Sequence, residues 1–211
     1  MSDKKDKTQL AIIGAGPGGY AAAFHAADLG QEVTLIDPKE NPGGVCLYHG
    51  CIPTKALLHF ADVKEDSEDA RQFGLKFGSV SVNSIKLRKW KENVVKKLTG
   101  GLGQLTKARK IKYIRGTAEL SDENTLNINT HEGKKNQLRF ENAIIATGAR
   151  ATALPGIEFD HDKIMNAMSA LELKDIPSRM LIVGAGYIGL EMGAIYHALG
   201  TEITFVEMQS G

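Results

Sequence analysis

Apolar and polar positions along the chain form a strand, a helix and a second strand near its beginning. A short apolar run over residues 10–13 is followed by glycines and an alanine-rich stretch over 20–29, and a second apolar run covers 32–36. Runs of this length predict strands, and the alanine-rich stretch between them predicts a helix. Residues 1–8 are polar and charged, and we expect them to form a disordered lead-in.

The same pattern occurs again 170 positions later, over residues 180–207. A repeat this distant is far too long for a solenoid and instead indicates two nucleotide-binding domains of one type. We expect the first domain over residues 9–150 and the beginning of a second over 151–211. The matching positions are Gly14 with Gly184, Gly16 with Gly186, Gly19 with Gly189, and Asp37 with Glu207.

The segments between the repeats predict further elements. Residues 53–72 have a helical pattern, and 83–110 predict a long basic helix broken at the glycines of 99–103. Residues 111–146 alternate apolar and polar positions between turns, which predicts a strand and then a small antiparallel β-meander. The expected fold class is therefore α/β: a Rossmann-like fold with a parallel sheet, covering helices and this meander, and with an incomplete second Rossmann domain.

Each glycine-rich turn carries chemistry because of its context. The pattern G-x-G-x-x-G follows a predicted strand, opens a helix, and is followed 18 positions after its last glycine by an acid. In such turns the glycines permit a tight bend, approach to a pyrophosphate and close helix packing, and the helix N-terminus favours the phosphates. Asp37 and Glu207 would accept hydrogen bonds from ribose hydroxyls. The alternative is a glycine-rich turn without a ligand.

Two side chains of the second repeat bear on its ligand. The carboxylate of Glu207 would repel a 2′-phosphate, which favours NAD over NADP. Tyr187 stands where the first repeat has Pro17. It is either a packing aromatic or a ring that covers the cofactor site until nicotinamide displaces it.

Cys46 and Cys51 are the only cysteines of the chain. Zinc would need two more ligands, for which His49 and His59 are the near candidates, and a pair of buried thiols is a further alternative. A redox pair is favoured, because Pro53 suits the first turn of a helix and would place Cys51 at its N-terminus. There the helix dipole and Lys55 would stabilise a thiolate.

Charge and hydropathy exclude several classes of protein. The chain has 26 Lys and Arg against 25 Asp and Glu, a net charge of +1, which argues against a nucleic-acid-binding protein. Residues 86–115 hold 11 basic residues and one acid, but they follow an apolar helical stripe and fit the solvated face of a helix. No apolar run approaches the roughly 20 residues of a membrane span, and the first residues lack a secretory signal. We therefore expect a cytoplasmic protein that binds neither membrane nor nucleic acid.

The segment GGVCLYHGCIPTKALLH resembles the redox-active segment of the flavin-dependent pyridine nucleotide–disulfide oxidoreductases. The resemblance extends to IIGAGPGGYAAA, IIATGAR and IVGAGYIGLEMG, and within the family it is greatest to the members that oxidise dihydrolipoamide with NAD. It implies FAD at the first turn and NAD at the second. The residues that it implies for FAD are Gly14, Gly16, Gly18, Gly19, Asp37, Gly43, Gly44, Cys46, Lys55, Ala118, Thr147 and Gly148, and those for NAD are Gly184, Gly186, Tyr187, Gly189 and Glu207.

The resemblance also implies catalytic roles and partners. Cys46 would attack the dithiolane of lipoamide, Cys51 would lie against the flavin, and Lys55 would pair with Glu191 near the flavin. No metal is implied. The partners would be the lipoyl domains of 2-oxoacid dehydrogenase complexes and a second copy of the chain in a homodimer.

The family continues well beyond residue 211, so we expect this chain to be a truncated form. The alternatives are a non-catalytic nucleotide-binding fragment, or a relative that reduces glutathione, trypanothione or mercuric ion, since these share the cysteine spacing.

Overall fold

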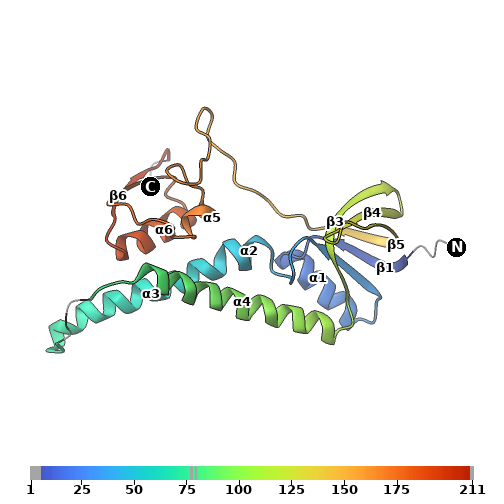
Figure 1. Cartoon of the computed structure of the whole chain (residues 1–211), viewed down its shortest axis with the longest axis horizontal. Helices are drawn as coiled ribbons and strands as arrows, with labels where there is room; N and C mark the ends of the chain where they lie inside the picture. The colour runs from blue at the N-terminus through green and yellow to red at the C-terminus, as the bar shows by residue number, and fades with distance from the viewer. Residues whose placement is uncertain (1–5, 77, 79, 210–211) are drawn as a thin grey trace. The chain divides into compact units, whose positions relative to one another are not determined.

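The computed structural model describes residues 6–76, 78 and 80–209. Contacts divide the chain into two units, one formed by residues up to Tyr48 with Lys96–Ala149, and one formed by His49–Val95 with the residues from Arg150 onward. The elements in chain order (Figure 1) are β1 (Asp6–Ile13), α1 (Pro17–Asp28), β2 (Val33–Asp37), α2 (Gly44–His49), α3 (Cys51–Asp69), the 3₁₀ helix η1 (Ala70–Phe73), α4 (Ser84–Ala108), β3 (Lys112–Asp122), β4 (Thr125–Thr130), β5 (Lys135–Ile145), α5 (Ala167–Ala170), β6 (Arg179–Val183), α6 (Tyr187–Ala198) and β7 (Glu202–Val206).

The first unit is built on one sheet of five strands that closes on itself in the order β1-β2-β3-β4-β5. β1 pairs in parallel with both β2 and β5, and β2 pairs in parallel with the start of β3. From Gly116 onward β3 pairs antiparallel with β4, which pairs antiparallel with β5. A Cβ at Gly116 would collide with the carbonyl oxygen of Asn129, so glycine is needed where β3 changes partner. The segment expected to form a strand and a small antiparallel meander does pair antiparallel, and it belongs to the same sheet as β1 and β2.

The first strand is longer than its sequence suggests. β1 begins at Asp6, and residues 6–8 pair with residues 138–140 of β5. The buried Thr8 hydroxyl donates a hydrogen bond of 2.9 Å to the carbonyl of Glu32. The expectation of a disordered lead-in over 1–8 is therefore wrong for residues 6–8, because β5 supplies hydrogen-bond partners that composition does not reveal. Residues 1–5 lie outside the described part of the chain.

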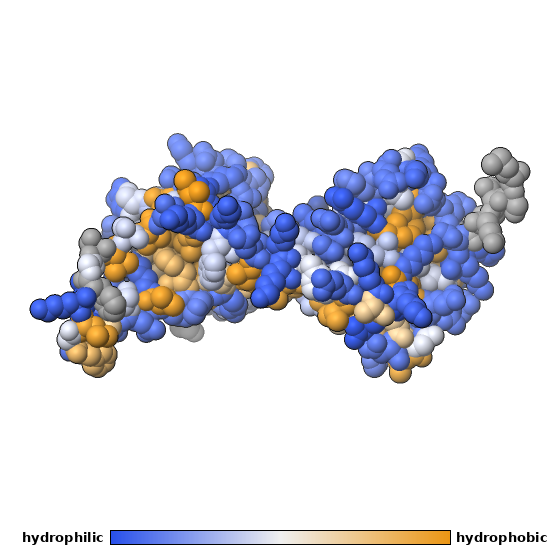
Figure 2. Space-filling view, turned by 60° about the horizontal axis from the view of Figure 1, so that its bottom comes forward, coloured by the Kyte–Doolittle hydropathy of each residue, from blue (hydrophilic) through white to orange (hydrophobic). Residues whose placement is uncertain are grey.

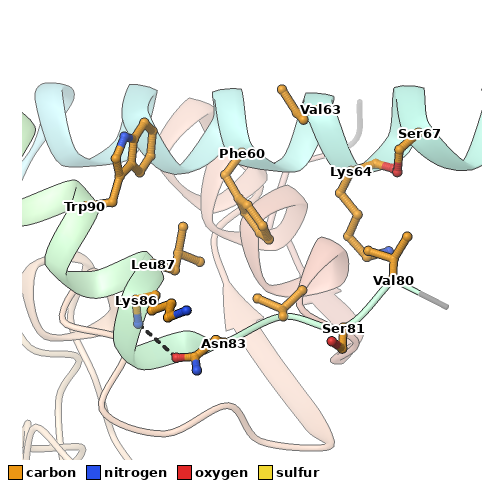
Figure 3. A pocket seen from close by; sticks show the side chains of 11 residues that line it. Phe60, Val63, Lys64, Ser67, Val80, Ser81, Asn83, Lys86, Leu87 and Trp90 are labelled. Carbon is orange, nitrogen blue, oxygen red and sulfur yellow. Dashed lines mark hydrogen bonds between the residues drawn. The ribbon is translucent and has the colours of Figure 1, made fainter. Parts of the chain in front are cut away.

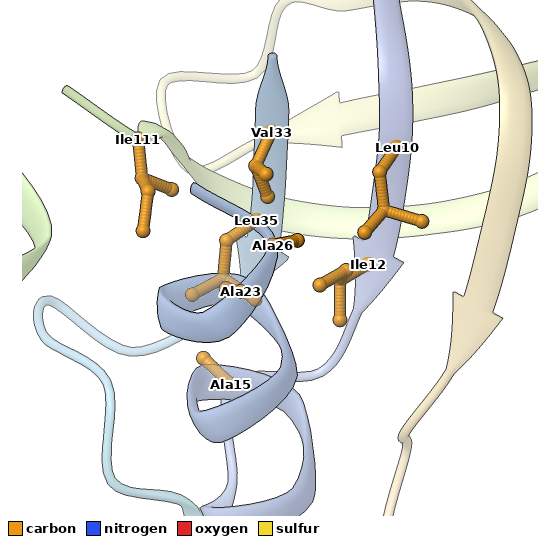
Figure 4. Packing of buried hydrophobic residues seen from close by; sticks show 8 residues of the cluster. All are labelled: Leu10, Ile12, Ala15, Ala23, Ala26, Val33, Leu35 and Ile111. Carbon is orange, nitrogen blue, oxygen red and sulfur yellow. The ribbon is translucent and has the colours of Figure 1, made fainter. Parts of the chain in front are cut away.

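The core of the first unit lies on both faces of the sheet. Helix α1 packs on β1 and β2 through the small side chains of Ala23 and Ala26, which let the helix approach Ile12 and Leu35 closely (Figure 4). A second cluster faces the opposite side of the strands and contains Ala11, Ile36, Leu126, Ile128, Leu138 and Phe140. Successive side chains of β1 therefore point to opposite faces of the sheet and pack in two different clusters.

Helix α4 runs without interruption from Ser84 to Ala108, so the predicted break at 99–103 is wrong. Of the three glycines there, only Gly103 makes a close contact within the described residues. A Cβ at Gly103 would collide with the side-chain oxygen of Asn41, and Thr99 and Thr106 are buried beside it. Glycine in a helix interior costs about 1 kcal/mol relative to alanine, and this close approach offsets the cost.

The second unit joins α3 and the first half of α4 to α5, α6 and the parallel pair β6–β7. Its core contains Leu57, Leu87, Leu171, Ile195 and Tyr196 among others. The grouping of residues 49–95 with this unit differs from the expected boundary, which placed them in a domain over 9–150.

Lysine 91 lies in this core although it is charged. It is 7% exposed and its ammonium donates a hydrogen bond of 2.6 Å to the carbonyl of Leu171, which joins α4 to the turn after α5. Burial lowers the pKa of Lys91.

Apolar side chains also interrupt the hydrophilic surface of the molecule (Figure 2). Within the described residues, no helix is both long enough and apolar enough to cross a membrane.

Candidate functional site

The first glycine turn connects β1 to α1 in a tight, closely packed bend. Gly14 has φ +97°, and a Cβ there would collide with the carbonyl oxygen of Ala146. A Cβ at Gly19 would collide with the carbonyl of Gly14, so the helix can pack on the turn only with glycine at both places. Both constraints agree with the roles predicted for these glycines.

The N-terminus of α1 is suited to an anion. Gly16 is the N-cap and offers no side-chain acceptor, and Pro17 begins the helix. Apart from neighbouring residues and the backbone of the helix itself, no heavy atom of the described residues lies within 4 Å of the position that a Cβ would take at Gly18. The N–H groups of the first turn have no side-chain cap, and such groups at a helix N-terminus suit a pyrophosphate.

Asp37, at the end of β2, is tied to the turn. Its carboxylate accepts hydrogen bonds from the backbone N–H groups of Ala15, at 2.8 Å, and Lys39, at 2.9 Å, and the residue is 9% exposed. A carboxylate has about four lone-pair sites, so two remain for a ribose hydroxyl.

The cysteine segment is attached to this same turn. The N–H of Gly43 donates a 2.8 Å hydrogen bond to the carbonyl of Ala15. A Cβ at Gly44 would collide with the backbone of Gly16, and both Gly43 and Gly44 have positive φ. The two glycines thus hold the start of α2, and with it Cys46, directly beside the predicted phosphate site.

The two cysteines occupy the starts of two consecutive helices. Cys46 is half-buried in α2, and Cys51 is exposed as the first residue of α3. Both are thiols in this structure. The placement of Cys51 at the helix N-terminus, which the position of Pro53 predicted, is confirmed. The hydroxyl of Thr54 donates to the carbonyl of Gly50 at 2.8 Å, which holds the first turn of α3 together.

Lys55 and Glu191 form the ion pair that the resemblance implied. Lys55 lies one turn after Cys51 on α3, and Glu191 lies in the second turn of α6. The hydrogen bond that the Lys55 ammonium donates to Glu191 raises the pKa of Lys55 despite some opposing desolvation, and the charges of Cys51 and Tyr187 act in the same direction as Glu191. A thiol, an ammonium, a carboxylate and a phenol therefore gather within the second unit.

The second glycine turn repeats the first in detail. Gly184 has φ +98°, and the carboxylate of Glu207 accepts a 2.8 Å hydrogen bond from the N–H of Ala185, as Asp37 does from Ala15. Backbone N–H groups of residues 209, 185 and 208 lower the pKa of Glu207. Tyr187 is 75% exposed at the start of α6, with its ring in solvent. Gly186 is the N-cap of α6 and again offers no side-chain acceptor.

The remaining residues predicted for FAD also lie in the first unit. Ala118 is half-buried in β3 opposite Ile128. Thr147 and Gly148 are exposed just after β5, and the Cα of Thr147 is 3.1 Å from the position that a Cβ would take at Gly14, so this segment lies beside the first glycine turn. Gly148 has φ +77°, which marks a turn where the chain leaves the sheet. Within the described residues, no three His, Cys, Asp or Glu side chains gather as a metal site would require.

Two residues that support the site were not predicted. Asn41 receives the Tyr48 hydroxyl on its backbone carbonyl at 3.0 Å and packs on Gly103, and Thr99 packs where a Cβ at Gly43 would be. Their roles depend on the path of α4 past the cysteine segment. A local sequence pattern carries no signal for contacts this distant in the chain.

Comparison with known proteins covers almost the whole chain. The family model described as pyridine nucleotide-disulphide oxidoreductase matches residues 8–211. Curated relatives include a dihydrolipoyl dehydrogenase of Haemophilus influenzae, 46% identical over 97% of this chain, and one of Vibrio cholerae, 44% identical over 97%. A dihydrolipoyl dehydrogenase of Geobacillus stearothermophilus is 41% identical over 98% of the chain.

The chain spans 43% of the length of each of these relatives. The crystal structure of LpdA from Mycobacterium tuberculosis shares the fold, with a TM-score of 0.88 at 23% identity. The match covers 97% of this chain and 45% of the LpdA chain.

Proposed function

Because the chain belongs to the pyridine nucleotide-disulphide oxidoreductase family, we propose that it carries the disulfide centre of a flavoenzyme that oxidises dihydrolipoamide with NAD. One observation carries this proposal: the Gly43 N–H donates to the Ala15 carbonyl, which attaches the cysteine segment to the first dinucleotide turn. A redox thiol pair and a phosphate site joined by backbone contacts suit a cofactor that exchanges electrons with the thiols.

The first turn fits FAD. The uncapped N-terminus of α1 would bind the pyrophosphate, and Asp37 would bind a ribose hydroxyl through the lone pairs that Ala15 and Lys39 leave open. Thr147, Gly148 and Ala118 complete the proposed contacts. The second turn, with Glu207 and Tyr187, would bind NAD. Bound FAD supplies two-electron transfer between the dithiol and NAD.

In the proposed reaction the Cys46–Cys51 pair begins as a disulfide. A thiolate of dihydrolipoamide attacks the sulfur of Cys46, the bond between the cysteines breaks, and Cys51 leaves as a thiolate. The second thiol of the substrate then attacks its own sulfur that is bound to Cys46. This closes the substrate disulfide and releases Cys46 as a thiol, so the substrate loses two electrons and the cysteine pair gains them.

The chain stabilises the leaving thiolate in two ways. Cys51 lies at the N-terminus of α3, where the helix dipole favours negative charge. Lys55 follows one turn later and is kept protonated by Glu191. Glu191 therefore acts on Cys51 through Lys55, as a positioning residue.

The proposed partners follow from the same assignment. Dihydrolipoamide bound to the lipoyl domains of 2-oxoacid dehydrogenase complexes would be the substrate. A second copy of the chain, in the cytoplasm, would complete a homodimer. The curated relatives named above are dihydrolipoyl dehydrogenases, which favours this substrate over glutathione or mercuric ion.

The visible spectrum of the chain, purified with FAD, tests the proposal before and after an anaerobic dithiol. We expect a flavin spectrum that gains a long-wavelength charge-transfer band when the thiols are reduced. Cys46→Ala should show the band without reduction, because Cys51 can no longer enter a disulfide, and Cys51→Ala should never show it.

A protein that stays colourless with FAD contradicts the proposal for this chain and favours a non-catalytic fragment. A band that persists in Cys51→Ala contradicts the assignment of the two thiols.

A further inference from the structure

A cavity lies in the second unit, between α3, α4 and the segment that precedes α4. Its volume is about 420 Å³, within the range of small-molecule sites. One face of α3 supplies residues 60, 63, 64 and 67, and one face of α4 supplies 86, 87 and 90, with residues 80–83 forming the third wall. The spacing of three and four residues places each set on a single helical face.

The walls of this cavity are apolar but reach solvent. Phe60 points from α3, and Leu87 and Trp90 point from α4, into the space between the helices (Figure 3). Trp90 is 41% exposed and Val63 is 53% exposed. When a ligand binds in a concave site and removes apolar surface from water, the change in free energy is favourable.

Among the described residues, two lysines and no acidic residue line the cavity. Lys64 reaches from α3 and Lys86 extends from α4 (Figure 3). The Lys64 ammonium already binds a carboxylate, that of Glu68 at 2.7 Å, and lowers the pKa of Glu68. Among the described residues no ion pair is recorded for Lys86.

The position of Lys86 is fixed by the start of its helix. The side-chain oxygen of Asn83 accepts a 2.9 Å hydrogen bond from the backbone N–H of Lys86, as an N-cap residue does (Figure 3). The cation therefore starts from an ordered turn at the edge of the apolar walls.

We propose that this cavity binds a small organic anion with an apolar body, such as an aromatic or branched aliphatic carboxylate. The apolar body would lie on Phe60, Leu87 and Trp90. The carboxylate would bind the ammonium of Lys86 and would compete with the carboxylate of Glu68 for the ammonium of Lys64. A cation would be repelled by both lysines, and a neutral ligand would leave their attraction unused. None of the residues that line the cavity is a cysteine or belongs to a glycine turn.

The fluorescence of Trp90 reports directly on the cavity, because it is the only tryptophan of the chain. The chain of 211 residues is titrated with 4-phenylbutyrate and, separately, with its neutral analogue 4-phenylbutanol. We expect a saturable change with the acid, and binding of the alcohol weaker by about tenfold, the value of one charge-assisted hydrogen bond.

Two variants distinguish binding in the cavity from general attraction to a basic helix. Lys86→Gln should lower the affinity for 4-phenylbutyrate by about tenfold. Lys89→Gln lies on the same helix but does not line the cavity, so it should leave that affinity unchanged. Val63→Asp, with folding checked by circular dichroism, should abolish binding by placing a carboxylate in the cavity.

Four results would overturn the proposal. They are the absence of a saturable change, equal binding of acid and alcohol, equal loss in Lys86→Gln and Lys89→Gln, and a change produced by an acidic peptide in place of the small anion. The readout involves neither flavin nor thiols. Its failure would therefore leave the redox proposal standing, and failure of the redox proposal would leave this one standing.

Discussion

The two glycine turns share one backbone geometry and differ in what surrounds them. Gly14 and Gly184 have φ +97° and +98°, and each donates its N–H at 2.8 Å to the strand that follows, at Ile36 or Val206. Yet Ala11 in β1 is fully buried, whereas the matching Leu181 in β6 is 61% exposed.

The difference arises from neighbouring strands. β1 lies between β2 and β5, while among the described residues β6 pairs with β7 alone. The shape of the turn is therefore encoded locally, by glycines and one acid, and its burial is supplied by strands distant in sequence. Substitutions at matched positions can separate these two contributions.

The largest expected contrast is Gly14→Ala against Gly184→Ala. Both place a side chain at positive φ, which costs about 1–2 kcal/mol. Only at position 14 would the methyl group also collide with backbone, that of Ala146, so we expect a loss of about 4 kcal/mol there. Urea unfolding followed by circular dichroism measures both, and equal losses would contradict the contrast.

A smaller contrast is expected between Asp37→Asn and Glu207→Gln. Asp37 is 9% exposed and accepts two backbone hydrogen bonds, so losing its charge should cost about 2 kcal/mol. Glu207 makes similar bonds in solvent, where water replaces them, and its substitution should cost little. The same denaturation experiment would refute this if the exposed acid proved the costlier to replace.

Tyr196 tests the packing of the second repeat, because the matching residue of the first is the small Ala26. Its buried hydroxyl donates at 2.8 Å to the carbonyl of Ala170, and burial raises its pKa to about 12. Tyr196→Phe should cost about 1 kcal/mol by leaving that carbonyl without its donor.

The pH dependence of Tyr196 has a definite sign. Its folded pKa lies above the ordinary value of 10.0, so the unfolded chain releases this proton first. Stability from this group is complete below pH 10 and is lost between pH 10 and about 12. Across this window the melting temperature should fall less steeply with rising pH for Tyr196→Phe than for the unsubstituted chain.

The smallest expected effect concerns Glu191, which has no counterpart in the first repeat because Ala21 occupies the matching position. Glu191→Gln removes the group that raises the pKa of Lys55. The pair stabilises the fold below the ordinary lysine pKa of 10.5 and loses its effect as pH rises above it. The difference in melting temperature between Glu191→Gln and the unsubstituted chain should shrink over that range, and Lys55→Met should behave as Glu191→Gln does.

The features that sequence predicted well are local. Both strand–helix–strand units, the tight turns at Gly14 and Gly184, and the position of Cys51 at a helix start follow from short segments of the sequence. The Lys55–Glu191 pair joins distant residues, and only the family resemblance indicated it.

The features that sequence missed depend on distant partners. Residues 6–8 form a strand because β5 lies beside them, and the glycines of 99–103 stay helical because one of them packs on Asn41. Burial of Lys91 depends on the carbonyl of Leu171, 80 positions away. No pattern within a window of the sequence records such neighbours.

The hydrogen bond from Ala15 to Asp37 has a consequence for the energetics of nucleotide binding. It holds the glycine turn in its bent form in the protein alone, so the turn is preorganised. The conformational entropy of these glycines is lost when the chain folds and not when a ligand arrives. Nucleotide affinity at this turn is then governed by contacts with a rigid receptor, and the unliganded and liganded turns should differ little in backbone order.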